Sequence, residues 1–205
     1  MWGELFGLAY PRATVIRAVE MDDAFAFFGF ERRPLVDEVA LKERYLRLAA
    51  DRHPDASGGA DVDFHLVQEA YKTLREPAAR LRHLIELEFP AHRRNGGAAP
   101  HAELFVQAGS AVQAAREVSQ RLENTGSALA RALLSPEIAE ALRRIREAYK
   151  LVRETRAELV GSLESLDRRW PNVSSEELSA LASSFRFLTR WTVQLSEWEF
   201  RLSNG

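Results

Sequence analysis

The most informative part of the sequence is LKERYLRLAADRHPD, residues 41–55. Leu41, Tyr45 and Leu48 recur at spacings of four and three residues, which predicts a helix with one apolar face. Pro54 ends this helix, because the residue before a proline is pushed out of the helical region. The tripeptide His53-Pro54-Asp55 is therefore expected in a loop that directly follows an amphipathic helix with basic flanks.

The sequence around this stretch predicts three more short helices. Asp22 and Asp23 suit the start of a first helix, and Gly29 suits its end. Asp37 is the expected cap of the helix that carries Leu41. After the loop, apolar residues spaced by three and four predict a third helix, and Pro77 suits the first turn of a fourth. The apolar faces of these two helices consist of Phe64, Val67, Tyr71 and Leu74, and of Leu81, Leu84, Ile85 and Leu87.

The second half of the sequence predicts three long helices packed lengthwise. A segment from Pro90 to Pro100 has the composition of a linker, and the alternating apolar spacing resumes after it. We expect the second long helix to be capped by Ser135, with Pro136 behind it, and the third to begin near Ser174. The predicted protein is all-α, with four short helices followed by an antiparallel three-helix bundle. The expected parts are an N-terminal extension (1–20), the four-helix domain (21–90), a linker (91–100) and the bundle (101–205). Met21 is an alternative start of translation.

Composition argues against several classes of function. The 205 residues carry 28 basic and 30 acidic side chains, and this near-balance is unlike the basic excess of a nucleic-acid-binding protein. Cysteine is absent, so the chain itself offers no thiolate metal site, and its scattered histidines make no paired ligands. There is no phosphate-binding GxxxxGK[ST] motif and no GxSxG motif. No apolar run approaches the roughly 18 residues of a membrane span. We therefore expect a cytoplasmic protein that binds partners, with no cofactor or metal and no membrane or nucleic-acid partner. Acid–base catalysis by His53 and Asp55 is the weaker alternative.

The N-terminal pattern resembles the J-domain of DnaJ-type co-chaperones. The resemblance covers about residues 22–87 and combines four features: the short aromatic first helix, LxxRYxxL at 41–48, His53-Pro54-Asp55, and VxxAYxxL at 67–74 followed by Pro77 and Arg80. A J-domain is a four-helix fold that stimulates ATP hydrolysis in a DnaK-type chaperone. The tripeptide His53-Pro54-Asp55 alone would be weak evidence, because it also occurs by chance. Its position between these two helices makes the resemblance to a J-domain specific.

The detail is closest to the HscB family of J-proteins, which deliver an iron–sulfur scaffold protein to an HscA-type, DnaK-like chaperone. The stretches that carry this resemblance are QEAYKTLREP (68–77), RLRHLIEL (80–87) and Arg186-Phe187-Leu188. The order of the two halves also agrees, so the resemblance spans about residues 22–202.

The resemblance implies a chaperone-binding site and a client-binding site. The first would consist of His53, Pro54 and Asp55, with steering charges from Lys42, Arg44, Arg47 and Arg52. Leu46 stands where DnaJ-type domains usually carry a basic residue, which implies fewer positive contacts with the chaperone. The second site would consist of Leu104, Phe105, Ala108 and Phe187. The acidic residues that continue along this helix in HscB are replaced by GSAVQAA at 109–115.

Two other functions remain open from the sequence. The bundle could serve a different client or self-association, and the chain could be a J-like scaffold that no longer stimulates a chaperone. Phe187 and Trp191 could also pack against a neighbouring helix or the N-terminal domain instead of facing a client.

Overall fold

The computed structural model describes residues 22–51, 61–92 and 101–204, which form seven helices and no strand. The N-terminal part consists of α1 (Ala24–Phe28), α2 (Glu38–Asp51), α4 (Asp61–Arg75) and α5 (Pro77–Glu88). The C-terminal part consists of α6 (Ala102–Glu123), α7 (Ala128–Arg169) and α8 (Ser175–Asn204). The prediction of an all-α protein is confirmed for the described residues.

The ends of the short helices are set by the predicted capping residues. The Asp23 carboxylate accepts hydrogen bonds from the backbone N–H groups of Phe25 and Ala26, at 2.9 and 3.1 Å. Gly29 ends α1 in the left-handed region, with φ of 69°, which a glycine adopts without a steric penalty. Asp37 caps α2 in the same way, and Pro77 occupies the first turn of α5.

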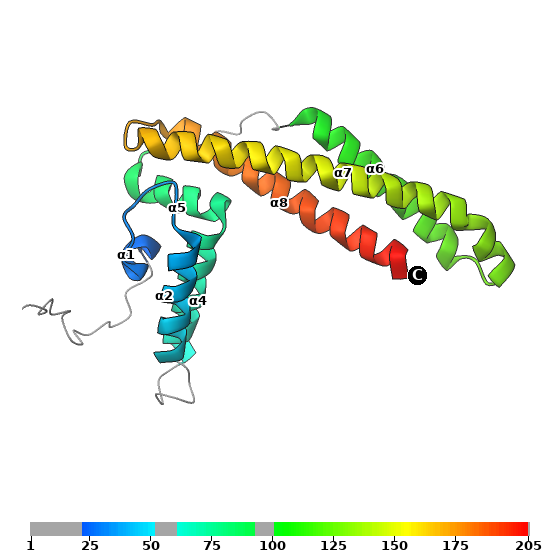
Figure 1. Cartoon of the computed structure of the whole chain (residues 1–205), viewed down its shortest axis with the longest axis horizontal. Coiled ribbons are helices and arrows are strands. Elements are labelled where there is room, and N and C mark those ends of the chain that lie inside the picture. The colour runs from blue at the N-terminus through cyan, green and yellow to red at the C-terminus, as the bar shows by residue number, and fades with distance from the viewer. Residues whose placement is uncertain (1–21, 52–60, 93–100, 205) are drawn as a thin grey trace, which may run out of the picture.

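Helices α2 and α4 lie side by side and project away from the long axis of the bundle (Figure 1). Their contact is built from buried Leu41, Val67 and Leu74, and from the stacked rings of Tyr45 and Tyr71, whose centroids are 4.1 Å apart. Asp51 ends α2 and Asp61 begins α4, and both lie at the end of the pair farthest from the bundle (Figure 1).

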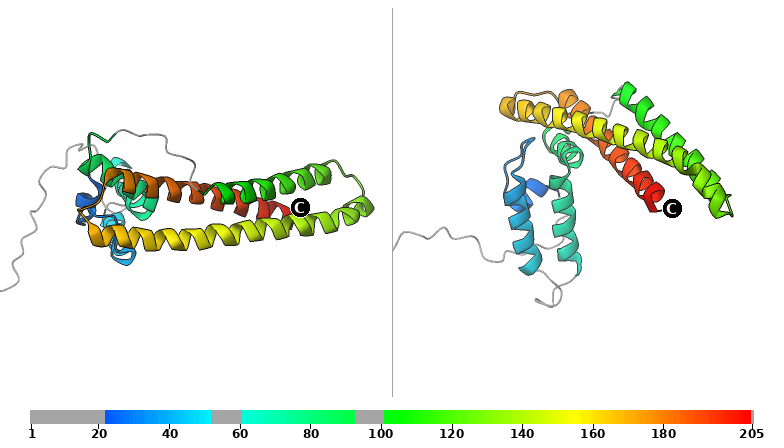
Figure 2. Two further views of the ribbon diagram at one scale, coloured as in Figure 1. Left: turned by 90° about the horizontal axis from the view of Figure 1, so that it is seen from above. Right: turned by 45° about the vertical axis from the view of Figure 1, so that its right-hand side comes forward.

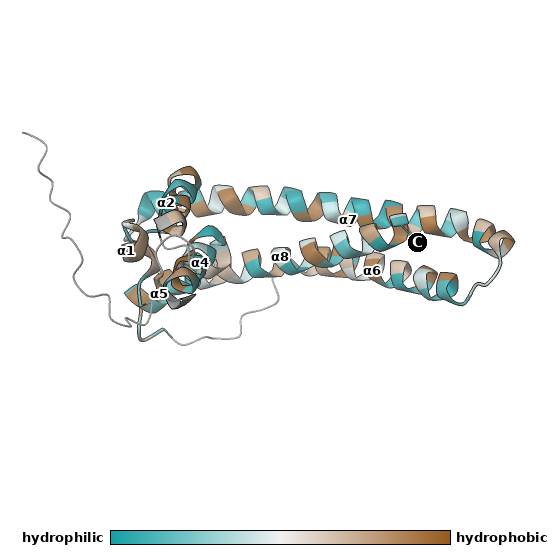
Figure 3. Cartoon of the chain, turned by 90° about the horizontal axis from the view of Figure 1, so that it is seen from below, coloured by the Kyte–Doolittle hydropathy of each residue, from teal (hydrophilic) through white to brown (hydrophobic). Residues whose placement is uncertain are grey.

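The bundle is organised around the long helix α7. Helices α6 and α8 run in the same direction as each other and opposite to α7 (Figure 2). Hydrophilic and hydrophobic residues alternate along α7, as expected for a helix that packs on one side and faces water on the other (Figure 3). The buried residues shared by the three helices are Leu104, Ala108, Ala111, Ala115, Val118, Ala141, Ile145, Ala148, Val152, Leu188, Leu195 and Leu202.

The predicted start of α7 is wrong. The helix begins at Ala128 instead of after Ser135, and Pro136 lies inside it. The intervening residues are mostly alanine and leucine, which favour a helix strongly, and Leu134 among them is buried. The start of α8 was predicted correctly. Ser174 and Glu177 exchange side-chain-to-backbone hydrogen bonds in a capping box.

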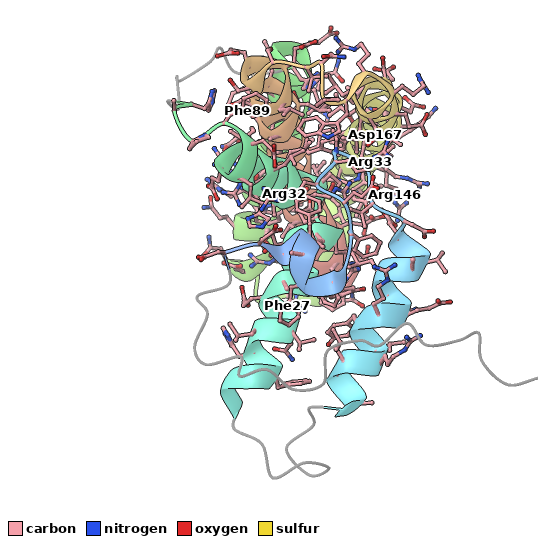
Figure 4. The ribbon with its side chains drawn as sticks, turned by 90° about the vertical axis from the view of Figure 1, so that its left-hand side faces the viewer. Phe27, Arg32, Arg33, Phe89, Arg146 and Asp167 are labelled. Carbon is pink, nitrogen blue, oxygen red and sulfur yellow. The ribbon has the colours of Figure 1, made fainter. Side chains whose placement is uncertain are left out.

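The N-terminal helices share a hydrophobic core with the end of the bundle that lies next to them. This core joins Phe25, Leu81 and Leu84 to residues of α7 and α8, among them Leu166 and Phe185. The same junction holds an ion pair between Arg33, in the turn before α2, and Asp167, near the end of α7 (Figure 4). The N-terminal helices are therefore held against the bundle by packing in the shared core and by this ion pair.

None of the described helices combines the length and apolar character required to cross a membrane.

Candidate functional site

The predicted chaperone loop lies outside the described residues. His53, Pro54, Asp55 and the neighbouring Arg52 all fall in the range 52–60. The described residues on either side of this range, Asp51 and Asp61, end α2 and begin α4 at the tip of the α2–α4 pair (Figure 1).

The three other predicted steering charges lie on α2, where they are not equivalent. Lys42 and Arg47 are exposed. Arg44 instead donates hydrogen bonds to the carbonyl oxygens of Phe28 and Gly29, at 2.6 and 2.7 Å, where α1 ends. Its guanidinium also lies over the ring of Phe30, 4.1 Å from the centroid. Arg44 therefore holds α1 against α2, and of the three residues only Lys42 and Arg47 are exposed.

Helix α1 is also held by His83 of α5. The Nε2 atom of His83 accepts a hydrogen bond of 2.9 Å from the backbone N–H of Ala24, and the imidazole stacks on Phe25. Only a neutral imidazole can accept this bond. Burial lowers the pKa of His83 below its ordinary value of 6.5, although the carboxylates of Asp23 and Glu86 oppose the shift.

A buried arginine fixes the turn that leads into α2. The side chain of Arg80 donates hydrogen bonds to the carbonyl oxygens of Pro34 and Leu74, at 2.8 and 2.6 Å. Arg80 is only 1% exposed, and this burial lowers its pKa. Because both acceptors are backbone atoms, the guanidinium sets the position of the turn relative to the end of α4.

Four aromatic side chains gather where the start of α6 meets the middle of α8. Phe105 lies 6.5 Å from Phe187 and 5.9 Å from Trp191, measured between ring centroids. Phe187 and Trp191 are themselves 6.2 Å apart, and His101 stacks on Phe187. Phe105 is 54% exposed, so the cluster opens to the surface on the α6 side. We call His101, Phe105, Phe187 and Trp191 the aromatic cluster.

The structure divides the predicted client-binding residues into exposed and buried members. Leu104 and Ala108 are 4% and 1% exposed, because they point from α6 into the bundle core. Leu104 and Ala108 belong to the core beneath the aromatic rings, as expected from the apolar spacing of this helix, and their part in client binding stays a prediction. Phe105 and the half-buried Phe187 lie close together, and their client role stays a prediction.

Two members of the aromatic cluster were not predicted as site residues. Trp191 follows Phe187 by one helical turn, and this spacing was a usable signal. His101 gave no such signal, because its position depends on a left-handed backbone (φ of 60°) at the start of α6. Within residues 22–51, 61–92 and 101–204, no group of three or more metal-binding side chains is close enough to hold an ion.

Comparison with known proteins finds HscB co-chaperones. The chain is 40% identical over 73 residues to the HscB homologue of Aromatoleum aromaticum, a match that covers 32% of this chain and 41% of that protein. It is 38% identical over 73 residues to the homologue of Chromobacterium violaceum, with coverage of 32% and 42%. The matched part thus spans about two fifths of the length of these curated relatives. No family model matches the chain.

Solved structures extend the likeness to nearly the whole fold. The crystal structure of human HscB covers 95% of this chain and 91% of its own, with a TM-score of 0.53 and 19% identity. HscB from Vibrio cholerae covers 88% of this chain and 99% of its own, with a TM-score of 0.53 and 14% identity. The chain is HscB-like. Its helices α1, α2, α4 and α5 have the arrangement of a J-domain, and α6 to α8 form the HscB-like C-terminal bundle.

Proposed function

We propose that this HscB-like chain is a J-type co-chaperone of iron–sulfur cluster assembly. It stimulates ATP hydrolysis by a DnaK- or HscA-type chaperone in the cytoplasm and brings an iron–sulfur scaffold protein to it. The observation that carries the proposal is the combination of sequence similarity to HscB co-chaperones with an HscB-like fold over 95% of the chain. We also propose residues 21–90 as the J-domain and 101–205 as the client-binding part, with 1–20 an extension and 91–100 a linker.

The proposed chaperone contact uses His53, Pro54 and Asp55. Pro54 restricts the backbone of the segment, so that an imidazole and a carboxylate are presented with little conformational freedom. Lys42 and Arg47 are exposed on the adjacent helix and attract an acidic surface of the chaperone, which raises the association rate. The tip of the α2–α4 pair lies away from the bundle, so a chaperone bound there leaves the bundle open (Figure 1).

The proposed client contact uses Phe105 and Phe187, supported from below by Leu104 and Ala108. Aromatic side chains exposed together are typical of binding surfaces, because they bury a large area at a low cost in side-chain entropy. The two proposed contacts use different parts of the chain, so in this proposal one chain holds a chaperone and a client at once. In this proposal the chain carries out no chemistry itself, and the ATP is hydrolysed by the partner.

The decisive experiment is single-turnover ATP hydrolysis by a DnaK-type chaperone with and without this chain. We expect the wild-type chain to accelerate hydrolysis, and Asp55→Asn to abolish the acceleration without changing the helical circular dichroism. Glu43→Gln is the matched control, because it removes one carboxylate from the exposed surface of α2 and leaves residues 53–55 intact. Equal acceleration by Asp55→Asn and the wild type would contradict the proposed chaperone contact.

The client contact has a separate experiment. We expect the full chain to bind an iron–sulfur scaffold protein in isothermal titration calorimetry, and Phe187→Ala to weaken this binding. If the wild-type chain shows no binding at high micromolar concentration, the bundle serves another client and only the chaperone contact of the proposal remains.

A further inference from the structure

Three exposed arginines lie on the helices that carry the aromatic cluster. Arg186 and Arg190 lie one turn apart on α8, and Arg190 follows Phe187 by three residues, so it borders the cluster. On α6, Phe105, Gly109, Val112 and Arg116 follow one another at spacings of four, three and four, which puts Arg116 on the helix face that carries Phe105. All three arginines are exposed.

These arginines have no carboxylate partner within the described residues, and the nearby carboxylates bond to other side chains. Glu103 accepts a hydrogen bond from Gln107, and Glu117 accepts one from Gln113, each within α6. Glu199 is paired with Arg146 of α7. Glu197, the next acidic residue of α8, lies about two turns beyond Arg190. The guanidinium groups of Arg116, Arg186 and Arg190 are therefore free to pair with carboxylates of a partner.

Gly109 of α6 faces Trp191 of α8. A Cβ atom at Gly109 would lie 3.9 Å from the Cη2 atom of Trp191, in ordinary van der Waals contact, so the glycine adds no side chain that would cover the indole. The indole is half-buried and forms edge-to-face contacts with both phenylalanine rings of the cluster. A partner side chain that reaches this point contacts aromatic carbon, while groups on either side of it meet guanidinium groups.

We propose that the aromatic cluster binds an acidic, apolar segment of the client, with Trp191 as its central contact and Arg116, Arg186 and Arg190 pairing with the client's carboxylates. This inference rests on the proposed client role of the bundle and adds the chemistry of the bound segment. A single exposed ion pair contributes little, but several arginines beside a buried aromatic anchor give both specificity and a faster association.

The test is fluorescence anisotropy of two labelled peptides with the full chain. Both peptides have leucines spaced three and four apart. One carries glutamate at the other positions and the second carries lysine. We expect the glutamate peptide to bind at least roughly tenfold more tightly than the lysine peptide, and added salt to reduce this difference, since exposed charges are screened by ions.

Charge-reversed variants identify the residues responsible. We expect Arg186→Glu with Arg190→Glu to weaken binding of the glutamate peptide by roughly tenfold, from the loss of two exposed pairs and the new repulsion. Arg131→Glu makes the same type of charge change on exposed α7, outside the cluster, and is expected to leave binding unchanged. Trp191→Ala is expected to weaken both peptides, and its melting temperature shows whether the bundle is intact.

Three results would overturn the proposal: equal binding of the two peptides, equal effects of the arginine variants and Arg131→Glu, or tighter binding of an oligothymidine of the same charge. The last would make the site a surface for single-stranded nucleic acid. Client-free ATPase stimulation by the wild-type chain is measured alongside. If the wild-type chain stimulates the ATPase but binds both peptides equally, this inference is refuted and the proposed function stands. If the wild-type chain does not stimulate the ATPase, the proposed function is refuted.

Discussion

Asp167 is the residue whose removal tests the junction between the J-domain and the bundle most clearly. One of its carboxylate oxygens accepts a hydrogen bond of 2.9 Å from the backbone N–H of Leu35, and both oxygens accept from Arg33, at 3.1 and 2.7 Å. The Asp167 side chain is 13% exposed and that of Arg33 is 43% exposed. The substitutions Asp167→Ala and Asp167→Asn separate the two contributions, because an asparagine oxygen can still accept from Leu35.

The expected magnitudes follow from these exposures. Leaving the partly buried N–H of Leu35 without an acceptor costs about 1–3 kcal/mol. The half-exposed ion pair contributes at most about 1 kcal/mol. Asp167→Ala therefore loses about 1–4 kcal/mol, which is a fall in melting temperature of roughly 2–16 °C for a protein of this size. Asp167→Asn, which keeps an acceptor for Leu35, loses less than about 4 °C.

The assay is thermal unfolding followed by circular dichroism at 222 nm. The control is Glu140→Gln on α7. Arg143 and Arg144 lower the pKa of Glu140 to about 2 through hydrogen bonds, but the group faces solvent, and its removal is expected to leave the melting temperature unchanged. An unchanged melting temperature in Asp167→Ala would refute the reasoning, because the N–H of Leu35 would then have another partner or the junction would contribute nothing to stability.

Two further predictions concern the J-domain core. Arg80→Ala leaves two backbone carbonyls without donors and opens a cavity. We therefore expect it to lower the free energy of unfolding, measured in urea, by about 3 kcal/mol or more. Arg82→Ala removes an exposed arginine from the same helix and is expected to have no comparable effect. The pKa of His83 is lower in the folded state than its ordinary 6.5, so the unfolded chain binds the proton more readily and stability is lost as the pH falls below that value. The melting temperature of the wild type should therefore fall more between pH 7.5 and 5.5 than that of His83→Gln, and parallel pH profiles would contradict this assignment.

Much of the fold follows from local features of the sequence. Asp23, Gly29, Asp37, Pro77 and Ser174 set helix ends where they were expected, because capping depends on residues within one turn of the helix end. The apolar faces could also be predicted from local sequence, because residues three and four positions apart lie on the same face of a helix. The start of α7 was missed because two local signals disagreed: Pro136 indicates a helix start, and the alanine- and leucine-rich residues before it continue the helix.

The parts that could not be predicted depend on contacts between distant positions. Asp167 binds groups 132 and 134 residues away, and the acceptor of the Arg80 Nε atom is 46 residues away. No periodic pattern reports such a pairing. For the client site, the sequence identified Phe105 and Phe187 through a family resemblance. The contact of Trp191 with Phe105 appears only when α6 and α8 are packed together.

The central claim is that one chain joins a chaperone-stimulating loop to a client-binding face. The most direct measurement is the amount of scaffold protein captured by the ATP-hydrolysing chaperone, in the presence of a mixture of Asp55→Asn and Phe187→Ala chains. Each variant keeps one of the two proposed sites. If both sites must act in the same molecule, the mixture captures no more scaffold than either variant alone, while the wild-type chain at half the concentration captures it fully. Restoration of wild-type capture by the mixture would contradict the claim.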